Sequence, residues 1–286
     1  MRKRTLARPT KNASKGAGKG KRDIITVPPK MDGAILGPSG DLVLIPRPRV
    51  VDHITYLKKP LQLRVFCVGD THFPFVDNRR LDIVIEEIRK YVPDAIVQMG
   101  DLFDLFHFYK DNKSSSWMTP EEEVYGARRE AEKFWVRAQD AAPKARCYQL
   151  LGNHDARMLH DVVRKAPEVE AVLNISDFFQ LWQFPGVETQ PNERTELELD
   201  GVVYHHGYKT QAGAMAKYYM QRCVTGHTHR GSVSFVRCRD ITIWQLDCGF
   251  IADENSPAMA YTAMARTQSV PGYGIVDEYG PRFVPL

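Results

Sequence analysis

The sequence predicts an α/β fold in which two mixed sheets pack together between flanking helices, giving four layers in the order α/β/β/α. From Arg64 onward, short apolar runs that end in Gly or Asp alternate with segments of helical periodicity, as expected for strands connected by helices. The second half changes to strand-like runs separated by turn signals. With 286 residues and 43% hydrophobic content, the chain can form one large domain and a tail.

The first half of this domain alternates strands and helices. Strands are predicted over 64–68, 95–99 and 147–151, because each is a short apolar run bounded by turn residues. A helix is predicted over 78–92, since Leu81, Val84, Ile85 and Ile88 recur at helical spacing before Pro93. A second helix is predicted over 121–142, where Thr119 is suited to be the N-cap and Pro120 the first helical residue.

The second half reads mainly as strands. Segments 195–199 and 202–206 flank Asp200-Gly201, a strong hairpin signal. Further strands are predicted over 222–225, 241–246 and 274–276, each of them apolar and β-branched. Ligand sites in α/β sheets lie at the carboxyl ends of strands, so the residues that follow these runs are the candidates for function.

The N-terminal segment differs from the rest of the chain in charge. Residues 1–22 carry nine Lys and Arg and no acidic residue, which leaves 30 basic against 35 acidic residues elsewhere, a net charge of −5. We expect 1–22 to be a disordered basic tail. Two interpretations remain open: an arm that contacts the phosphates of DNA or RNA, or a solvated tail without a specific partner. Residues 23–63, broken by Pro and Gly, are expected to form a short extended or β arm.

Composition also bears on location. The sequence has no run of 18 apolar residues and no secretory signal at its N-terminus, so we expect neither a membrane partner nor export. Its five cysteines show no CxxC spacing, and their odd number argues against a disulfide framework. These features predict reduced thiols in a cytoplasmic protein.

Five short motifs, in order along the chain, supply side chains suited to a pair of metal ions. Carboxylate, amide and imidazole ligands together favour Mn, Fe or Zn over Ca or a thiolate cluster. Two such ions about 4 Å apart can hold a phosphoryl group for displacement. The motifs are Asp70-Thr71-His72, Gly100-Asp101-Leu102-Phe103-Asp104, Gly152-Asn153-His154-Asp155, His205-His206-Gly207 and Gly226-His227-Thr228-His229.

This series resembles the calcineurin-like metallophosphoesterase superfamily, over roughly Arg64 to Gly231, with the terminal strand included in a domain of 64–286. The resemblance implies two divalent ions, with Mn expected and Fe, Zn or Ni as alternatives. One ion would be held by Asp70, His72, Asp101 and His229. The other would be held by Asp101, Asn153, His206 and His227. The pair would lower the pKa of a bound water and so generate a hydroxide nucleophile without a side-chain base.

The resemblance also suggests roles beside the ions. His154 would protonate the leaving oxygen, and Asp104 would orient its imidazole. The structural alternatives are a second-sphere histidine for His154 and a helix N-cap for Asp104. Arg157 could bind a phosphoryl oxygen or form a surface salt bridge. His206 fits the family's ligand position, whereas strand alternation would turn His205 to the opposite face.

One departure from the family bears on the substrate. In the Ser/Thr protein phosphatases an Arg follows the acid that corresponds to Asp104, but here Leu105 and Phe106 follow it. The aromatic stretch 102–109, followed by Lys110 and Lys113, offers stacking faces beside positive charge, unless its rings pack inward.

We therefore expect a phosphodiesterase or nuclease acting on nucleic acid or nucleotides. The alternatives are a phosphomonoesterase, acting on a small molecule or a protein, and a non-catalytic metal-binding scaffold. The sequence leaves the oligomeric state open.

Overall fold

The computed structural model describes residues 34–36, 42–44, 60–109, 117–165, 180–256 and 269–286. The predicted basic tail 1–22 and the loop lysines Lys110 and Lys113 lie outside these ranges. So does most of the arm 23–63, although β1 (Ala34–Leu36) and β2 (Leu42–Leu44) pair as an antiparallel hairpin. The chain divides into two compact units, 1–52 and 53–286, and the second contains everything described below.

Two sheets form the centre of this unit. The strands of the larger sheet are β3 (Val65–Val68), β4 (Ala95–Gln98), β5 (Arg146–Gln149), β6 (Val187–Thr189), β12 (Gly272–Asp277) and β13 (Gly280–Pro285). Their order is β13-β12-β3-β4-β5-β6; β3 to β6 are parallel, and β12 is antiparallel to both neighbours.

The smaller sheet consists of β7 (Leu197–Leu199), β8 (Val202–Tyr204), β9 (Arg222–Thr225), β10 (Ser232–Cys238) and β11 (Ile241–Asp247). Its order is β10-β11-β9-β8-β7, with parallel pairs on both sides of β9 and antiparallel pairs at both edges. Both sheets are therefore mixed, as predicted.

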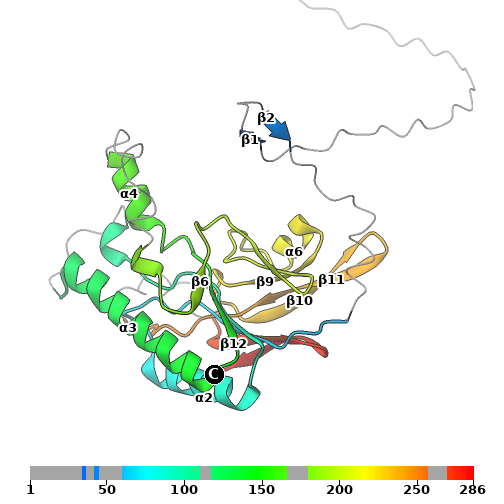
Figure 1. The fold of residues 1–286 in the computed structure, drawn as a ribbon, viewed down its shortest axis with the longest axis horizontal. Helices are drawn as coiled ribbons and strands as arrows, with labels where there is room; N and C mark the ends of the chain where they lie inside the picture. Colours follow the sequence, from blue (N-terminus) through cyan, green and yellow to red (C-terminus); the bar gives the residue numbers. More distant parts are fainter. Residues whose placement is uncertain (1–33, 37–41, 45–59, 110–116, 166–179, 257–268) are drawn as a thin grey trace, which may run out of the picture. The chain divides into compact units, whose positions relative to one another are not determined.

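Helices cover the outer faces. They are α2 (Asn78–Tyr91), α3 (Pro120–Ala141) and α6 (Ala214–Tyr219), whereas α4 (Arg157–Lys165) has no buried residue and stands away from both sheets. Figure 1 shows α2 and α3 together on one side of the sheets and α6 on the other. The predicted helix signals are confirmed: Thr119 and Glu122 form a capping box with Pro120 in the first turn, and α2 ends just before Pro93.

Three apolar clusters hold these layers together. The outer cluster packs Val84 and Ile88 of α2 and Phe134 of α3 against Phe66 and Ile96 of the larger sheet. The central cluster lies between the sheets and includes Val65, Cys67, Val97, Tyr204 and Leu246. A third joins Met215 of α6 to Cys223 and Ile243. Alternate residues of β3 thus face opposite layers, which is why its whole run is apolar.

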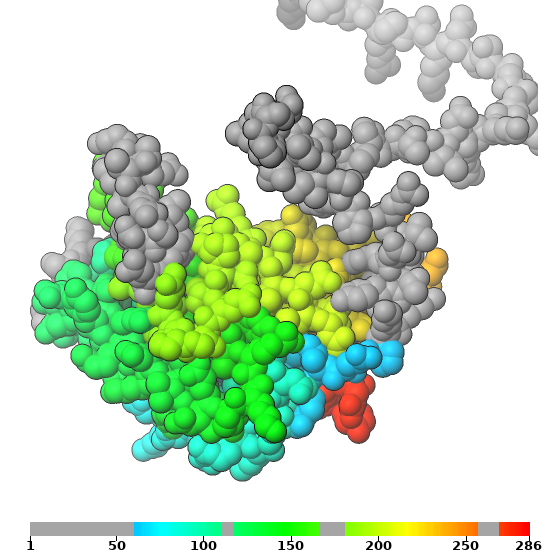
Figure 2. Space-filling view, in the orientation of Figure 1, coloured from blue at the N-terminus to red at the C-terminus, as the bar shows by residue number. Residues whose placement is uncertain are grey.

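The segment before β6 packs on α3. Arg128 Nη1 donates to the carbonyl of Leu181, and Gln139 Nε2 donates to the carbonyl of Pro185. In the space-filling view the green residues of α3 and the yellow-green residues after 180 lie side by side on this face (Figure 2). These contacts fix β6 at the edge of the larger sheet, beside β5.

Some elements were not expected from the sequence. Strands β6, β10 and β13 and helices α4 and α6 gave no clear signal, because they are short, charged or bounded by Gly and Pro. Among the described residues, no helix is both long and apolar enough to span a bilayer. All five cysteines are unpaired.

Candidate metal centre

The five motifs meet where the strands end. Asp70 follows β3, Asp101 follows β4 and Asn153 follows β5, while His206 follows β8 and His227 follows β9. These are all parallel strands, so their carboxyl ends lie at the same edge of the two sheets. Motifs that are more than 150 residues apart in sequence are brought together there, as in the pair of Asp70 and His229.

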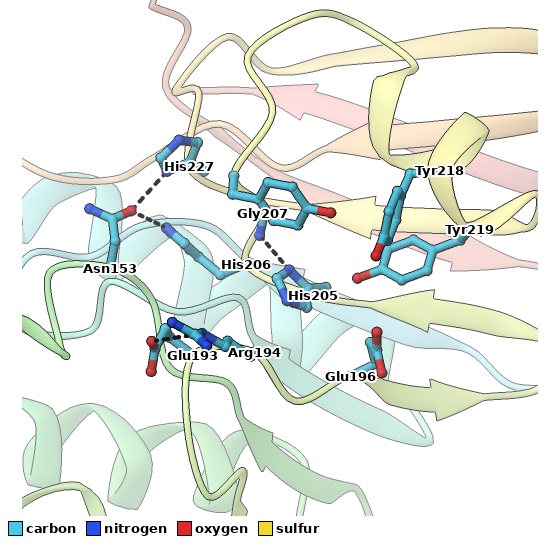
Figure 3. A pocket seen from close by; sticks show the side chains of 11 residues that line it. Asn153, Glu193, Arg194, Glu196, His205, His206, Gly207, Tyr218, Tyr219 and His227 are labelled. Carbon is cyan, nitrogen blue, oxygen red and sulfur yellow. Dashed lines mark hydrogen bonds and ion pairs between the residues drawn. The ribbon is translucent and has the colours of Figure 1, made fainter. Parts of the chain in front are cut away.

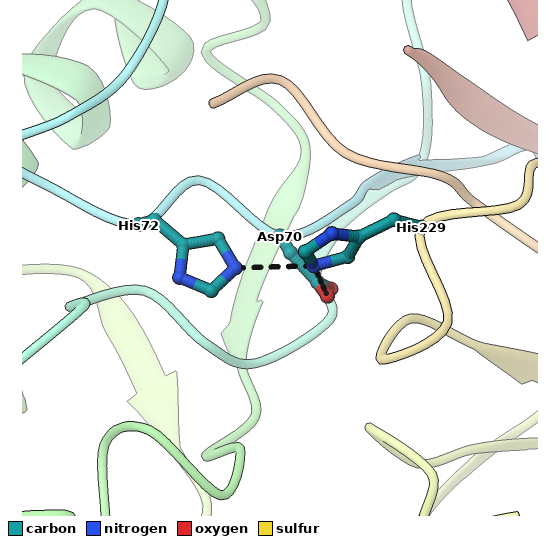
Figure 4. A group of neighbouring side chains, drawn as sticks. All are labelled: Asp70, His72 and His229. Carbon is teal, nitrogen blue, oxygen red and sulfur yellow. Dashed lines mark hydrogen bonds and ion pairs between the residues drawn. The ribbon is translucent and has the colours of Figure 1, made fainter. Parts of the chain in front are cut away.

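The first group of converging side chains is Asp70, His72 and His229 (Figure 4). His229 Nε2 lies 3.0 Å from Asp70 Oδ2 and 3.2 Å from His72 Nε2. His72 Nδ1 lies 3.0 Å from Asp104 Oδ1, which favours a hydrogen on Nδ1 and a lone pair on Nε2. Three atoms suited to binding a cation therefore face one another.

The second group is Asp101, His206 and His227, with Asn153 beside them. His206 Nε2 lies 3.2 Å from both Asp101 Oδ2 and Asn153 Oδ1, and His227 Nδ1 lies 2.8 Å from the same Asn153 oxygen. His206 Nδ1 donates to the carbonyl of Met99 at 3.0 Å, which leaves Nε2 with its lone pair toward the group.

This donor set fits divalent cations. In each group, carboxylate oxygens, imidazole nitrogens or an amide oxygen approach one another with lone pairs facing, an arrangement that only a bound cation or an added proton stabilises. The backbone is packed tightly against the two carboxylates. A Cβ on Gly152 would lie 2.1 Å from Asp101 Oδ1, and a Cβ on Gly226 would lie 2.2 Å from Asp70 Oδ1. The residues present therefore suit a pair of metal ions.

A third group links the first two. His72, Asp101 and His154 offer ligand atoms within 4.8 Å of one another. Asp101 and His72 each belong to two groups, so both lie between the two clusters. The motifs predict that Asp101 is shared by both ions; in the structure it groups with His72 and also with His154, whose Nε2 lies 3.8 Å from Asp101 Oδ2.

Backbone strain accompanies the site. His72, Asp101, His227 and His229 all have positive φ angles of 49° to 73°, in the left-handed region that bulky residues rarely adopt. Such conformations each cost about 1–3 kcal/mol and concentrate at functional sites. No sequence signal marks these positions, because none of them is a glycine.

The pKa values of Asp101 and His206 are shifted because carboxylates and imidazoles lie close together in a buried space. Burial would raise the pKa of Asp101, but nearby His206 and His154 hold that pKa well below its usual range. Burial would lower the pKa of His206, yet Asp101 and Asp70 outweigh it and raise that pKa to about 10. The carboxylates thus attract positive charge into a buried space.

Asp104 and His154 are in direct contact, as expected. His154 Nδ1 lies 3.0 Å from both the carboxylate Oδ1 and the backbone carbonyl of Asp104. Burial would raise the pKa of Asp104, but hydrogen bonds from His154 and His72 lower it well below its usual range. One carboxylate oxygen therefore holds both the His72 ring and the His154 ring.

Arg157 lies against this pair. Its Nη1 donates to the carbonyl of Asp104 at 3.0 Å, and its Nη2 lies 2.6 Å from His154 Nε2. The guanidinium carbon is also 5.0 Å from the centre of the Tyr109 ring. Within the aromatic stretch, Phe103 is fully buried, while Tyr109 is 42% exposed. Inward packing and exposure are therefore both present in this loop.

Two further acids are buried near the candidate metal centre, and the sequence predicted no role for either. Asp155 accepts hydrogen bonds from the backbone N–H groups of Leu102, Phe103 and Gly152 and from the Trp182 indole. Burial and the charge of Asp101 raise the pKa of Asp155 to about 6. The sequence signal for Asp155 was its position directly after His154 in the third motif, which could have marked it as part of the site.

Asp247 is the second of these acids. It accepts hydrogen bonds from Thr228 and from the backbone N–H of Gly249, beside the last motif. Burial raises the pKa of Asp247 to about 7. Asp247 is the last residue of the apolar strand β11, so its place at a strand end was a signal in the sequence.

Comparison with known proteins identifies the family of this chain. Residues 63–207, half of the chain, match the model of the calcineurin-like phosphoesterase family. The chain therefore belongs to that family, whose members hydrolyse phosphoesters with divalent metal ions.

The chain is 25% identical, over 246 residues, to the Gene 54 proteins of the mycobacterium phages D29 and L5. Each alignment covers 78% of this chain and 93% of the phage protein.

Among solved structures, similar chains include a Vps29 mutant from Entamoeba histolytica and the phosphoesterase Yfce from E. coli. The first is 11% identical with a TM-score of 0.37 and covers 78% of this chain and 99% of its own. The second is 16% identical with a TM-score of 0.35 and covers 75% and 88% respectively. The family assignment rests on the family model and not on these similarities.

Proposed function

We propose that this protein is a phosphodiesterase that acts on nucleic acid or nucleotides through a dinuclear metal centre. The observation that carries the proposal is that Asp101 groups with His206 and His227 on one side and with His72 on the other, so its carboxylate lies between the two proposed ion positions at one edge of the sheets. One ion would bind Asp70, His72, Asp101 and His229. The other would bind Asp101, Asn153, His206 and His227. The mixture of oxygen and imidazole ligands is well suited to manganese.

When bound, the ions would supply positive charge to the phosphoryl oxygens and activate a water. The remaining chemistry belongs to side chains. Asp104 accepts from His154 Nδ1, which fixes the ring and directs Nε2 away from the carboxylate. From there His154 would give a proton to the leaving oxygen, while Asp104 stabilises the charged imidazole.

Arg157 adds a condition to this role. Its Nη2 lies 2.6 Å from His154 Nε2, and because a guanidinium only donates, Nε2 must be an acceptor in this arrangement. For His154 to act as an acid, Arg157 would have to leave Nε2. A phosphoryl oxygen is an acceptor that could draw the guanidinium away, since Arg binds phosphate through paired N–H groups. We therefore assign Arg157 to substrate binding.

The proposal also covers the domain bounds, the basic segment and the cell compartment. Residues 64–286 would be the catalytic domain, and the basic segment 1–22 would add salt-dependent affinity for a nucleic acid. The unpaired cysteines suit a reducing compartment such as the cytoplasm.

The experiment that tests the proposal is hydrolysis of bis-p-nitrophenyl phosphate and p-nitrophenyl phosphate by the manganese-loaded protein. We expect the diester to be preferred, Asp101→Asn to abolish activity, and His154→Ala to slow turnover while both ions stay bound. A preference for the monoester would favour a phosphomonoesterase, and absence of hydrolysis with every divalent ion tested would favour a scaffold. Loss of both ions from His154→Ala would refute its assigned role as an acid.

A further inference from the structure

A cavity of about 450 Å³ opens directly beside the ligand groups. At one end it is lined by Asn153, His206 and His227, and at the other by Tyr218 and Tyr219 (Figure 3). This volume is within the range of small-molecule sites in proteins. Because the cavity shares three walls with the candidate metal centre, a phosphoester bound there would place its organic part in this space.

His205 gives the cavity a hydrogen-bond donor of fixed identity. The side chain is 4% exposed and lines the cavity between the two ends. Its Nδ1 accepts from the backbone N–H of Gly207 at 2.8 Å, so Nδ1 carries a lone pair and Nε2 must carry the hydrogen. No residue in the described part of the chain accepts a hydrogen bond from this Nε2. A ligand that enters the cavity therefore meets one N–H that is available to donate a hydrogen bond.

The far end of the cavity is aromatic. Tyr208 and Tyr218 meet edge to face, with ring centres 5.9 Å apart, and Tyr218 meets Tyr219 in the same way at 5.1 Å. Tyr208 and Tyr218 are 50% and 61% exposed, so much of their ring surface is available. The Lys209 ammonium already lies 5.0 Å and 5.4 Å from the centres of these two rings. A second cation is therefore disfavoured here, whereas a flat, uncharged ring is not.

Carboxylates complete the lining. Glu193 and Glu196 both face the cavity, and Arg194 lies 3.6 Å from Glu193. Glu196 has no ion-pair or hydrogen-bond partner among the residues that the structure describes. A carboxylate accepts two hydrogen bonds side by side, so it matches a ligand edge that carries two adjacent N–H donors.

We propose that this cavity, which we call the base pocket, binds the nucleobase of a nucleotide whose phosphate lies at the metal centre. The proposal rests on the proposed function, and it specifies the substrate further. Guanine matches best, because its ring nitrogen and amino group present adjacent donors to Glu196 while its O6 or N7 can accept from His205 Nε2. Tyr218 and Tyr219 supply the stacking surface.

The test uses guanosine, which has no phosphate, and the full-length protein freed of metal with a chelator. Binding is measured by isothermal titration calorimetry, with adenosine, cytidine and tetramethylammonium as competitors for the same pocket. We expect guanosine to bind most tightly, and Tyr218→Ala to weaken it by on the order of tenfold through lost stacking. The matched control is Tyr279→Ala, which removes an 82% exposed tyrosine from the turn after β12, outside the base pocket.

Two further variants test the hydrogen bonds. Glu196→Gln should weaken guanosine more than adenosine, whereas Glu188→Gln on β6, outside the pocket, should change neither. His205→Gln should also weaken guanosine, with thermal unfolding used to verify that this buried variant is folded.

Each other outcome overturns the proposal. If no nucleoside binds, or if Tyr218→Ala binds guanosine as tightly as Tyr279→Ala does, the cavity is not a base pocket. Tighter binding of tetramethylammonium would identify a cation site instead, and equal binding of all nucleosides would remove guanine as the ligand. None of these binding measurements needs metal or turnover. A negative result would therefore refute the base pocket without bearing on the hydrolysis assay, and the reverse also holds.

Discussion

Replacing Gly226 by alanine should disable the candidate metal centre through a single methyl group. Gly226 opens the last motif, and its Cβ position lies 2.2 Å from Asp70 Oδ1 and 3.3 Å from Asp70 Cγ. Real Cβ atoms essentially never approach another heavy atom within 3.0 Å, so the carboxylate oxygen must move by at least 0.8 Å. The φ angle of Gly226 is not in the left-handed region, so alanine adds no backbone strain of its own.

The magnitude follows from this displacement. Asp70 also accepts from the backbone N–H of His227 at 2.9 Å and lies 3.0 Å from His229, so it cannot move without disturbing both. A misplacement of about 1 Å at a catalytic site can cost about 100-fold in rate. Overpacking a buried position costs typically 1–3 kcal/mol, which a domain of this size can tolerate. We therefore expect a folded protein with about 100-fold lower kcat/KM.

The assay is metal-dependent hydrolysis of bis-p-nitrophenyl phosphate, combined with the metal content of the purified protein and its urea unfolding curve. The matched control is Gly126→Ala in α3, where the added Cβ would meet only Pro74, at 3.8 Å. That variant should keep full activity and gain about 0.5–1 kcal/mol in stability from helix propensity. If Gly226→Ala is folded, binds both ions and is as active as the Gly126→Ala control, Asp70 does not hold a metal in this position.

Two further predictions concern the buried acids. In Asp155→Asn, the new amide NH₂ replaces an oxygen that accepts from two N–H groups, either those of Phe103 and Trp182 or those of Leu102 and Gly152. Each buried donor left unpaired costs about 1–3 kcal/mol. Relief of the repulsion from Asp101 offsets part of this cost. The free energy of unfolding should therefore fall by roughly 1–3 kcal/mol in urea titration, and an unchanged midpoint would contradict this. Burial raises the pKa of Asp247 to about 7, so the folded, metal-free protein holds a proton that the unfolded chain has lost above about pH 4. Stability should therefore fall as the pH rises from about 4 to about 7, and Asp247→Asn should flatten this slope; an equally steep slope in the variant would show that other groups cause it.

Local sequence patterns were sufficient to predict most of the elements that position the site. The apolar runs before Asp70, Asp101 and Asn153 became β3, β4 and β5, because a strand buried on both faces must be apolar throughout. Helical spacing and Pro93 placed α2, and the Thr119-Pro120 cap placed α3, almost to the residue, since these signals depend only on neighbours in sequence. By contrast, β6 and β13 are edge strands whose stability comes from one partner strand, and they left little trace in the sequence.

The candidate site also has features that the sequence predicted and features that it did not. Residue type and order indicated which side chains could bind metal, because few chemical groups serve as ligands and each followed a strand. The left-handed backbone at His72, Asp101, His227 and His229 had no such signal. Neither did the base pocket, whose walls come from the segment before β7, the end of β8 and helix α6.

The sequence by itself indicated the chemistry expected of this protein: the candidate ligand types, their order, and the strands that carry them. Only the tertiary structure decided how those groups share space, including the two rings held by Asp104, the four N–H groups that converge on Asp155, and the donor that His205 presents to the cavity. The physical reason is that ligand identity is a property of single residues, whereas hydrogen-bond partners, tautomers and cavity walls depend on segments that meet only when the two sheets pack together.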